Sequence, residues 1–79
     1  MSPTVFREKG YRFFFFSREE KRMHVHVLSG KGEAKFWLEP EVLLVKSHKY
    51  DREQLTEIKS IIENHHEELV SAWRRHFDR

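Results

Sequence analysis

The first half of the chain alternates apolar and polar residues with the two-residue period of half-buried β-strands. Segments with this pattern are separated by turn residues and predict strands at about residues 4–7, 11–16, 24–28 and 33–38. Between the first two, Glu8-Lys9-Gly10 provides a glycine for a left-handed turn position, which predicts a tight hairpin. After Pro40, residues 41–46 form either a short edge strand or an irregular packed segment. The pattern therefore predicts an antiparallel meander of four to five strands.

From Asp51 onward the apolar residues recur at the three- and four-residue steps of a helix. Asp51 and Gln54 have the spacing of a capping box, so the helix is expected to begin at about residue 52. One stripe carries Leu55, Ile58, Ile62, Leu69 and Trp73. A helix over residues 52–77 would be roughly 39 Å long, which is longer than so small a sheet is wide. Such a helix either breaks near Asn64-His65-His66 or projects its last turns. We favour one helix, kinked at most, with Trp73 and Phe77 as a contact surface.

Together the two patterns predict a single α+β domain in which one long C-terminal helix packs on the sheet. One helix covers one face, yet Phe13 and Phe15 point to one face of their strand while Phe14 and Phe16 point to the other. An apolar patch on an uncovered face is typical of an association surface. We expect that face to contact a second copy of the chain or a different protein. The alternative is a sheet that curls enough to bury both sides.

The composition narrows the class of protein. The chain has 79 residues and no cysteine, so disulfides and thiolate metal sites are excluded, and so small a core gains from a partner. No apolar run approaches the roughly 20 residues that cross a bilayer, and we expect a cytoplasmic protein without membrane contact. Fifteen Lys and Arg against 13 Asp and Glu give a net charge of +2, which is compatible with an RNA, DNA or acidic protein partner but does not require one.

The segment His24-Val25-His26-Val27 places two imidazoles on the same face of a strand. They could supply two ligands of a metal site, which needs three or four converging groups. Candidates for a third ligand are His48, His65, His66, His76 and Glu33. No recognised metal spacing links any of these to the strand pair, so solvated or hydrogen-bonded imidazoles are favoured over a metal site. No cofactor is expected.

A second use of paired imidazoles is general acid–base chemistry on RNA. One of His24 and His26 would accept the proton of an attacking 2′-hydroxyl while the other protonates the leaving oxygen. A cation, Arg12 or Lys35, would stabilise the charge on the phosphorus centre. These four residues are the candidate catalytic set, although no specific motif links them. The chain carries no phosphate-binding glycine loop and no nucleophilic Ser or Cys motif.

Nucleic-acid binding without catalysis is a further interpretation. Basic side chains interleave with aromatic ones on the predicted strands and again in the last helical turns, as in surfaces that stack bases and contact phosphates. The candidate binding residues are Phe14, Phe16, Trp37, Trp73 and Phe77. Any half-exposed sheet shows a similar alternation, and we regard that simpler explanation as the favoured one.

Several segments taken in order resemble a known family. They are Pro3-Thr4-Val5-Phe6, Tyr11-Arg12-Phe13-Phe14-Phe15, His24-Val25-His26-Val27, Ala34-Lys35-Phe36-Trp37-Leu38 and Trp73 to Phe77. With these the chain resembles, over nearly its whole length, the small bacterial proteins of domain of unknown function family 4160 (DUF4160). Members typically have Pro-Pro where Arg22-Met23 stands here, at the end of the expected charged loop over residues 17–23.

The resemblance implies a role and a partner. Members of this family are found beside a second family of unknown function, DUF2442, in what look like toxin–antitoxin pairs. The resemblance therefore implies the toxin-like component of such a pair, with an antitoxin-like partner. We expect such a component to act on RNA or on translation. It implies no catalytic residues. The alternative is a non-enzymatic module that binds protein or nucleic acid as the regulatory or antitoxin-like partner.

Overall fold

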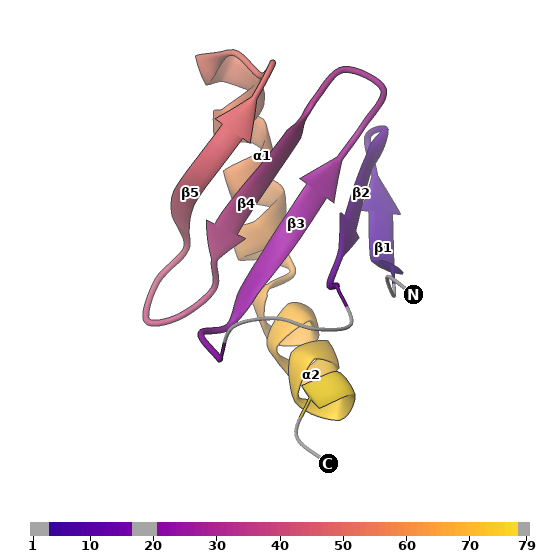
Figure 1. Cartoon of the computed structure of the whole chain (residues 1–79), viewed down its shortest axis with the longest axis vertical. Helices are drawn as coiled ribbons and strands as arrows, with labels where there is room; N and C mark the ends of the chain where they lie inside the picture. The colour runs from indigo at the N-terminus through magenta and orange to yellow at the C-terminus, as the bar shows by residue number, and fades with distance from the viewer. Residues whose placement is uncertain (1–3, 17–20, 78–79) are drawn as a thin grey trace.

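The computed structural model describes residues 4–16 and 21–77, and its centre is a five-stranded antiparallel sheet (Figure 1). The strands lie in the order β1-β2-β3-β4-β5, so each pairs with its neighbours in the sequence. Their bounds are β1 (Thr4–Glu8), β2 (Tyr11–Phe14), β3 (His24–Leu28), β4 (Glu33–Trp37) and β5 (Leu43–His48). The predicted meander is confirmed, with the fifth strand present.

Two strands, β2 and β5, have ends that differ from the prediction by two residues, and the other strands agree with it within one residue. The second strand, β2, ends at Phe14 and not at residue 16, because Phe14 is the last residue paired with β3. The edge strand β5 begins at Leu43 and continues to His48, two residues beyond the predicted end. Part of the expected charged loop, residues 17–20, lies outside the described residues. The later end of β5 matters most, because it adds a histidine to the sheet.

The C-terminal part of the chain forms two helices, α1 (Arg52–Asn64) and α2 (His66–Phe77), so the prediction of one long helix is wrong. The break falls at His65, whose backbone has φ −109° and ψ 19°. The His65 N–H donates to the carbonyls of Ile61 and Ile62, at 3.1 and 3.2 Å, which ends α1. The break lies within Asn64-His65-His66, the segment where the sequence predicts a break as the alternative to one continuous helix. Neither helix is long and apolar enough to cross a membrane.

The start of α1 has the predicted capping box. The Gln54 N–H donates to the Asp51 carboxylate at 2.8 Å, and the Asp51 N–H donates to Gln54 Oε1 at 3.0 Å. These bonds satisfy amides that have no partner inside the first turn of a helix.

Both helices lie on one side of the sheet, which we call the helix face, and the opposite side is the open face. In Figure 1 the helices are behind the sheet, with α2 at the end where β3 starts. Successive residues of β3 alternate between the faces: Val25 and Val27, on the helix face, are 0% and 1% exposed. Phe13 and Phe15 are buried on the same face, which confirms the predicted alternation of the phenylalanine run.

The core forms between the helix face and the apolar stripes of the helices. The stripe of α1 buries Ile58, Ile61 and Ile62, and that of α2 buries Leu69 and Trp73. A polar contact ties α1 to β2 as well, because the Tyr11 hydroxyl donates to Glu57 at 3.1 Å. Burial and this carboxylate raise the pKa of Tyr11 to about 12.

The β1–β2 hairpin turns through Lys9 and Gly10, with φ of 53° and 85°. Positive φ at both central residues is the mark of a type I′ turn, whose twist matches that of the flanking strands. The predicted tight hairpin with glycine in a left-handed position is confirmed.

His65 joins three elements where the helices meet. Its Nε2 lies 2.8 Å from the Glu8 carboxylate at the end of β1, and its Nδ1 lies 2.8 Å from Glu68 on α2. The ring also stacks on Phe6, with centroids 4.2 Å apart. The hydrogen bonds to Glu68 and Glu8 raise the pKa of His65 above its ordinary value. The helix breaks where this side chain turns toward the sheet.

The contacts of His65 with Glu8 and Glu68 should make the free energy of unfolding depend on pH. Because the folded state raises the pKa of His65, its extra stabilisation is fully present below about pH 6.5 and is lost as pH rises through the folded value. Replacing His65 with glutamine should lower the free energy of unfolding at about pH 5.5 by ~0.5–1 kcal/mol more than at about pH 8.5. Urea unfolding at both pH values measures this difference. An equal loss for His65→Gln at both pH values would contradict the prediction.

Candidate functional site

A row of side chains crosses the open face, because antiparallel register places residues of successive strands side by side. Phe14 of β2 lies opposite His26 of β3, and His26 lies opposite Lys35 of β4. Lys35 in turn lies opposite Lys46 of β5. We call these four residues the first row. It brings one aromatic ring, one imidazole and two ammonium groups onto one line across the sheet.

A second row lies parallel to the first, displaced from it by two residues on each strand. Arg12 of β2 lies opposite Leu28 of β3, and Leu28 lies opposite Glu33 of β4. Glu33 lies opposite His48 of β5. The two rows border a hollow of about 440 Å³ whose lining also includes Phe16. This hollow is the candidate site.

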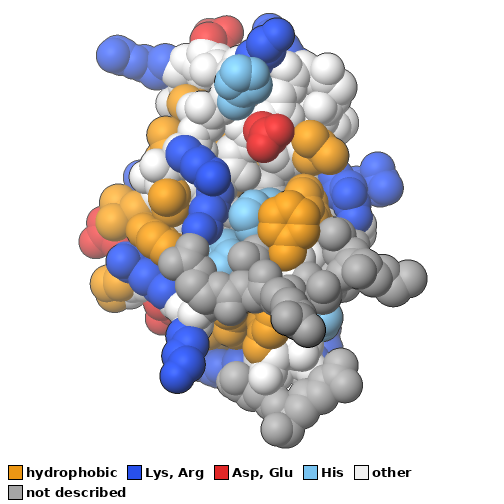
Figure 2. Space-filling view, in the orientation of Figure 1, with side chains coloured by type: hydrophobic (Ala, Val, Ile, Leu, Met, Phe, Trp, Pro, Cys, Tyr) orange, Lys and Arg blue, Asp and Glu red, His pale blue; other side chains and the backbone are white. Residues whose placement is uncertain are grey.

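Basic side chains dominate the charge around the hollow. Arg12, Lys35 and Lys46 line it, and Glu33 is the acidic residue of its lining. Arg7 lies opposite Arg12 and extends the same charge onto β1. Figure 2 views this face and shows Lys and Arg side chains around the histidines and a hydrophobic ring. An anion on this face therefore meets positive charge from four strands.

Two of the cations make cation–π contacts with aromatic rings. The Arg12 guanidinium lies 4.4 Å from the centre of the Phe14 ring, and Arg12 Nε donates to the Thr4 hydroxyl at 2.6 Å. The Lys35 ammonium lies 4.9 Å from the Trp37 ring centre. Cation–π contacts of this kind restrain a long charged side chain. Arg12 and Lys35 are thus held on the open face, where the sequence placed them.

His26 lies in the middle of this surface. Its ring is 4.4 Å from that of Phe16 and 5.6 Å from that of Phe14, and the residue is half-buried. Phe16 is 43% exposed, while Phe14 is 7% exposed beneath it. A ring that is exposed beside an imidazole and several cations can stack on a nucleic-acid base. Of Phe14 and Phe16, both predicted to bind, Phe16 is the accessible one.

His24 does not reach the hollow. Its side chain is 0% exposed, and its Nδ1–H donates to the Arg22 carbonyl oxygen at 2.7 Å. Its ring packs against Trp73 of α2, with centroids 5.1 Å apart, because α2 lies at the end of the sheet where β3 starts. The pairing of His24 with His26 as two working imidazoles on one surface is therefore corrected. His24 instead joins the core behind His26, whose ring centre is 5.1 Å away.

The aromatic residues of α2 are also packed inside the fold. Trp73 is 5% exposed and contacts Phe15 and Phe77, at centroid distances of 5.3 and 4.1 Å. Phe77 is half-buried and packs on the core. The prediction that the Trp73 and Phe77 end projects as a contact surface is wrong, because the break at His65 folds α2 back against the sheet. Trp37 is half-buried on the open face, between Lys35 and Arg22.

The described residues contain no group of three or more His, Asp or Glu side chains that could hold a metal ion. Two of the candidate third ligands have structural contacts elsewhere. His65 bonds to Glu8 and Glu68, and His66 Nε2 donates to the Leu38 carbonyl oxygen at 2.8 Å.

Sequence reasoning missed two basic residues of the hollow, Lys46 and His48. The sequence gives Lys46 no role in the edge strand over residues 41–46, and it offers His48, beyond the predicted end of that strand, only as a third metal ligand. The available signal was the two-residue spacing itself, because Lys46 and His48 must share a face if the strand continues to residue 48.

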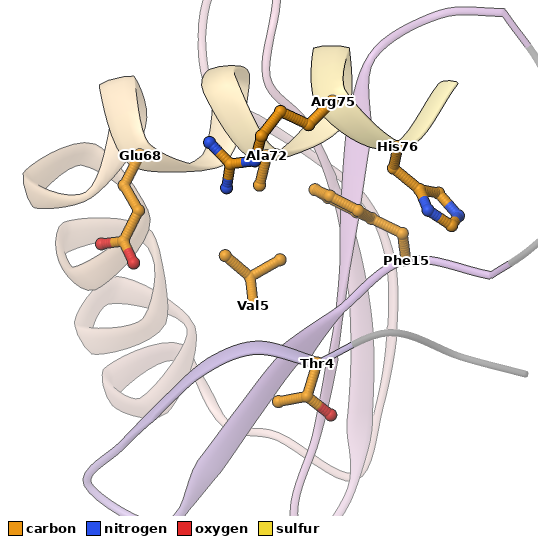
Figure 3. Close-up of a pocket in the computed structure, with 7 residues that line it drawn as sticks. All are labelled: Thr4, Val5, Phe15, Glu68, Ala72, Arg75 and His76. Carbon is orange, nitrogen blue, oxygen red and sulfur yellow. The ribbon is translucent and has the colours of Figure 1, made fainter. Parts of the chain in front are cut away.

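A second hollow, of about 350 Å³, lies between β1 and α2 (Figure 3). Val5, Phe15 and Ala72 form its apolar wall, while Arg75 extends over it toward the side where Glu68 lies. His76 lies at its edge and points away from its centre. It holds one cation and one carboxylate, so it lacks the concentrated charge of the first hollow.

The edge strand β5 exposes three consecutive apolar side chains. Leu43, Leu44 and Val45 are 41%, 44% and 38% exposed. The register shifts between the pairs Lys35–Lys46 and Phe36–Leu44, so Val45 is the extra residue of a bulge on this edge strand. An exposed apolar cluster of this kind is typical of a protein contact surface.

The comparisons with known proteins identify a family. The model of a domain of unknown function (DUF4160) matches residues 10–74, which includes the helix-face core and the residues of both rows. No curated protein and no solved structure matches the chain.

Proposed function

The chain belongs to the DUF4160 family, and on that premise we propose that it binds single-stranded RNA on the open face of its sheet. The observation that carries the proposal is the hollow itself, where Arg12, Lys35 and Lys46 surround His26 beside the exposed ring of Phe16. Proteins that bind single strands combine a basic surface for the phosphates with aromatic rings for the bases.

The geometry favours a single strand over a duplex. The cations come from β1, β2, β4 and β5, so they spread across the sheet and do not follow one helix that could enter a groove. Phe16 offers its ring to an unpaired base, and bases become accessible for stacking when they are not paired. A sheet surface of this kind recognises extended nucleic acid by stacking and phosphate contact.

The binding test uses a fluorescein-labelled oligouridine of about 12 nucleotides, and the anisotropy is followed at several salt concentrations. The double variant Lys35→Gln/Lys46→Gln should weaken binding at least tenfold at low salt. If each lysine contacts one phosphate, the slope of log Kd against log salt should also fall by about 1.4, since each contact to a single strand contributes about 0.7.

The matched control removes the same charge from the helices. Lys59 and Arg74 are exposed on α1 and α2. Lys59→Gln/Arg74→Gln should leave the affinity within about twofold, because these residues lie outside the two rows. Equal losses in the two double variants would show that net charge alone drives binding, and undetectable binding by the native protein would overturn the proposal.

We further propose that this RNA binding serves the toxin-like component of a bacterial toxin–antitoxin pair, with a DUF2442-type antitoxin-like partner. The exposed cluster of Leu43, Leu44 and Val45 supports a protein partner, because it adjoins the hollow through Lys46 and a bound protein there would obstruct RNA. In cells, induction of the chain alone should arrest growth, and the Lys35→Gln/Lys46→Gln variant at equal protein level should not. Growth without arrest would assign the chain to the alternative, a non-enzymatic module that binds protein or nucleic acid as the regulatory or antitoxin-like partner.

A further inference from the structure

The hollow contains a second histidine that faces it from another strand. His26 lies in the first row on β3, and His48 lies in the second row on β5. Both line the hollow. Lys35 and Lys46 continue the first row from His26 to β5, so that Lys46 and His48 share one face of β5. Two imidazoles therefore approach one cavity from opposite corners, with the ammonium groups of Lys35 and Lys46 and the carboxylate of Glu33 in the same lining.

The separation suits a nucleotide. His26 and His48 lie two strands apart and two residues apart in register, so their Cα atoms are on the order of 12 Å apart. Each imidazole extends several ångströms from its backbone, and the cavity of about 440 Å³ lies between them. A phosphodiester with its ribose can lie in that gap with one ring nitrogen near the 2′ oxygen and the other near the 5′ oxygen.

We propose that this hollow cleaves RNA by transphosphorylation, with His26 and His48 as the acid–base pair. The inference rests on the proposed RNA binding and goes beyond it. One imidazole accepts the proton of the ribose 2′-hydroxyl while the 2′ oxygen forms a bond to phosphorus. The bond between phosphorus and the 5′ oxygen breaks, and the other imidazole, protonated beforehand, donates its proton to that oxygen. The products are a 2′,3′-cyclic phosphate and a 5′-hydroxyl, so atoms and charge balance without an oxidant or a co-reactant.

The cations have a defined place in this reaction. Negative charge accumulates on the non-bridging oxygens as the 2′ oxygen attacks, and preorganised positive groups stabilise it. Lys35 and Lys46 lie next to one another in the first row, and Arg12 borders the same cavity. The aromatic support of Arg12 and Lys35 limits the reorganisation that would otherwise oppose this stabilisation.

The test is a labelled oligodeoxynucleotide that contains a single ribonucleotide, with products analysed by mass spectrometry. The native protein should produce a 2′,3′-cyclic phosphate and a 5′-hydroxyl at that position. The all-deoxy version should bind and stay intact, because it lacks the attacking hydroxyl. His26→Ala and His48→Ala should each lower the cleavage rate at least 10²-fold, with Kd within about threefold of native. His76→Ala, purified identically, should cleave at the native rate, and the loss of cleavage in the His26 and His48 variants alone would then exclude a contaminating nuclease.

Two further measurements keep the proposal falsifiable. His26 packs on Phe14 and Phe16, so His26→Gln replaces His26→Ala if circular dichroism shows that the alanine variant is unfolded. An oligonucleotide with sulfur in place of the 5′ bridging oxygen has a leaving group that needs no proton. It should restore cleavage to only one of the two variants, the one that lacks the acid.

The outcomes separate this inference from the proposed function. RNA that is bound but not cleaved overturns the inference and leaves RNA binding intact, while absence of binding overturns both. Cleavage that persists in both histidine variants, or that yields a 5′-phosphate, would also overturn the assignment.

Discussion

Replacing Phe13 with alanine is expected to leave most of the protein unfolded. Phe13 is 0% exposed on the helix face, and its ring stacks on Phe6 with centroids 4.5 Å apart. Truncation of a buried phenylalanine costs about 3–5 kcal/mol, through lost burial and the cavity that remains. A single core in a chain of this size supplies only about that much stability. Circular dichroism and urea unfolding of the variant measure the loss.

The same phenylalanine run provides the matched control. Phe16 lies three residues after Phe13 and is 43% exposed. Phe16→Ala should therefore change the free energy of unfolding by less than about 1 kcal/mol. It should weaken RNA binding all the same, because the exposed ring is the one that stacks on a base. Similar destabilisation by both substitutions would mean that the two faces of the sheet are not distinguished as described.

Replacing Gly32 with alanine is expected to destabilise the fold by several kcal/mol. A Cβ atom at this position would collide with the carbonyl oxygen of His48, and it would lie 3.2 Å from the carbonyl carbon of Lys49. Both are backbone atoms, so the contact cannot be relieved by a rotamer change. A hydrogen bond also holds the turn between β3 and β4 in place, because the Tyr50 hydroxyl donates to the Gly32 carbonyl at 2.8 Å. Thermal unfolding followed by circular dichroism should show a large decrease in Tm.

Gly30, in the same turn, gives the control. A Cβ atom there meets nothing within 4 Å, so Gly30→Ala should change the free energy of unfolding by less than about 0.5 kcal/mol. Any fraction of Gly32→Ala that remains folded should also cleave RNA more slowly, since the collision displaces the backbone of His48. Equal stability of the two variants would contradict the close approach of the turn to β5.

Local patterns predicted much of the fold. The two-residue period placed the strands, because each is half-buried against one layer of helices. The capping box placed the first residue of α1, because the side chains of Asp51 and Gln54 each accept from the other's backbone N–H. The alternation of Phe13 and Phe15 with Phe14 and Phe16 followed from strand geometry alone. Each of these features depends on residues close together in the chain.

The features that depend on distant contacts could not be predicted in this way. The period of β3 placed His24 and His26 on one face, but it could not show that α2 lies at the end of the sheet and buries His24 against Trp73. The helical stripe contains no apolar residue at His65 or His66, which is where the helix breaks. That gap is visible in the sequence, but the reason for it, the contact of His65 with Glu8, lies 57 residues away.

Strand β3 therefore contributes one histidine, His26, to the candidate site instead of two. The other imidazole comes from β5, and it reaches the hollow because the strand continues beyond its irregular register at Phe36 to Glu33 and His48. A period of two predicts which residues share a face of one strand. It does not predict which residues of two strands lie opposite one another, and that register is what assembles the hollow.

The order of the strands also has a consequence for folding kinetics. Every strand pairs with its neighbour in the sequence, so the sheet can assemble hairpin by hairpin with short loops to close. Proteins dominated by such local contacts have low contact order and fold quickly. The bonds from Tyr11 to Glu57 and from Glu8 to His65 span 46 and 57 residues, and they close much larger loops than the hairpins do. Docking of the helices, and not pairing of the strands, is therefore expected to limit the folding rate.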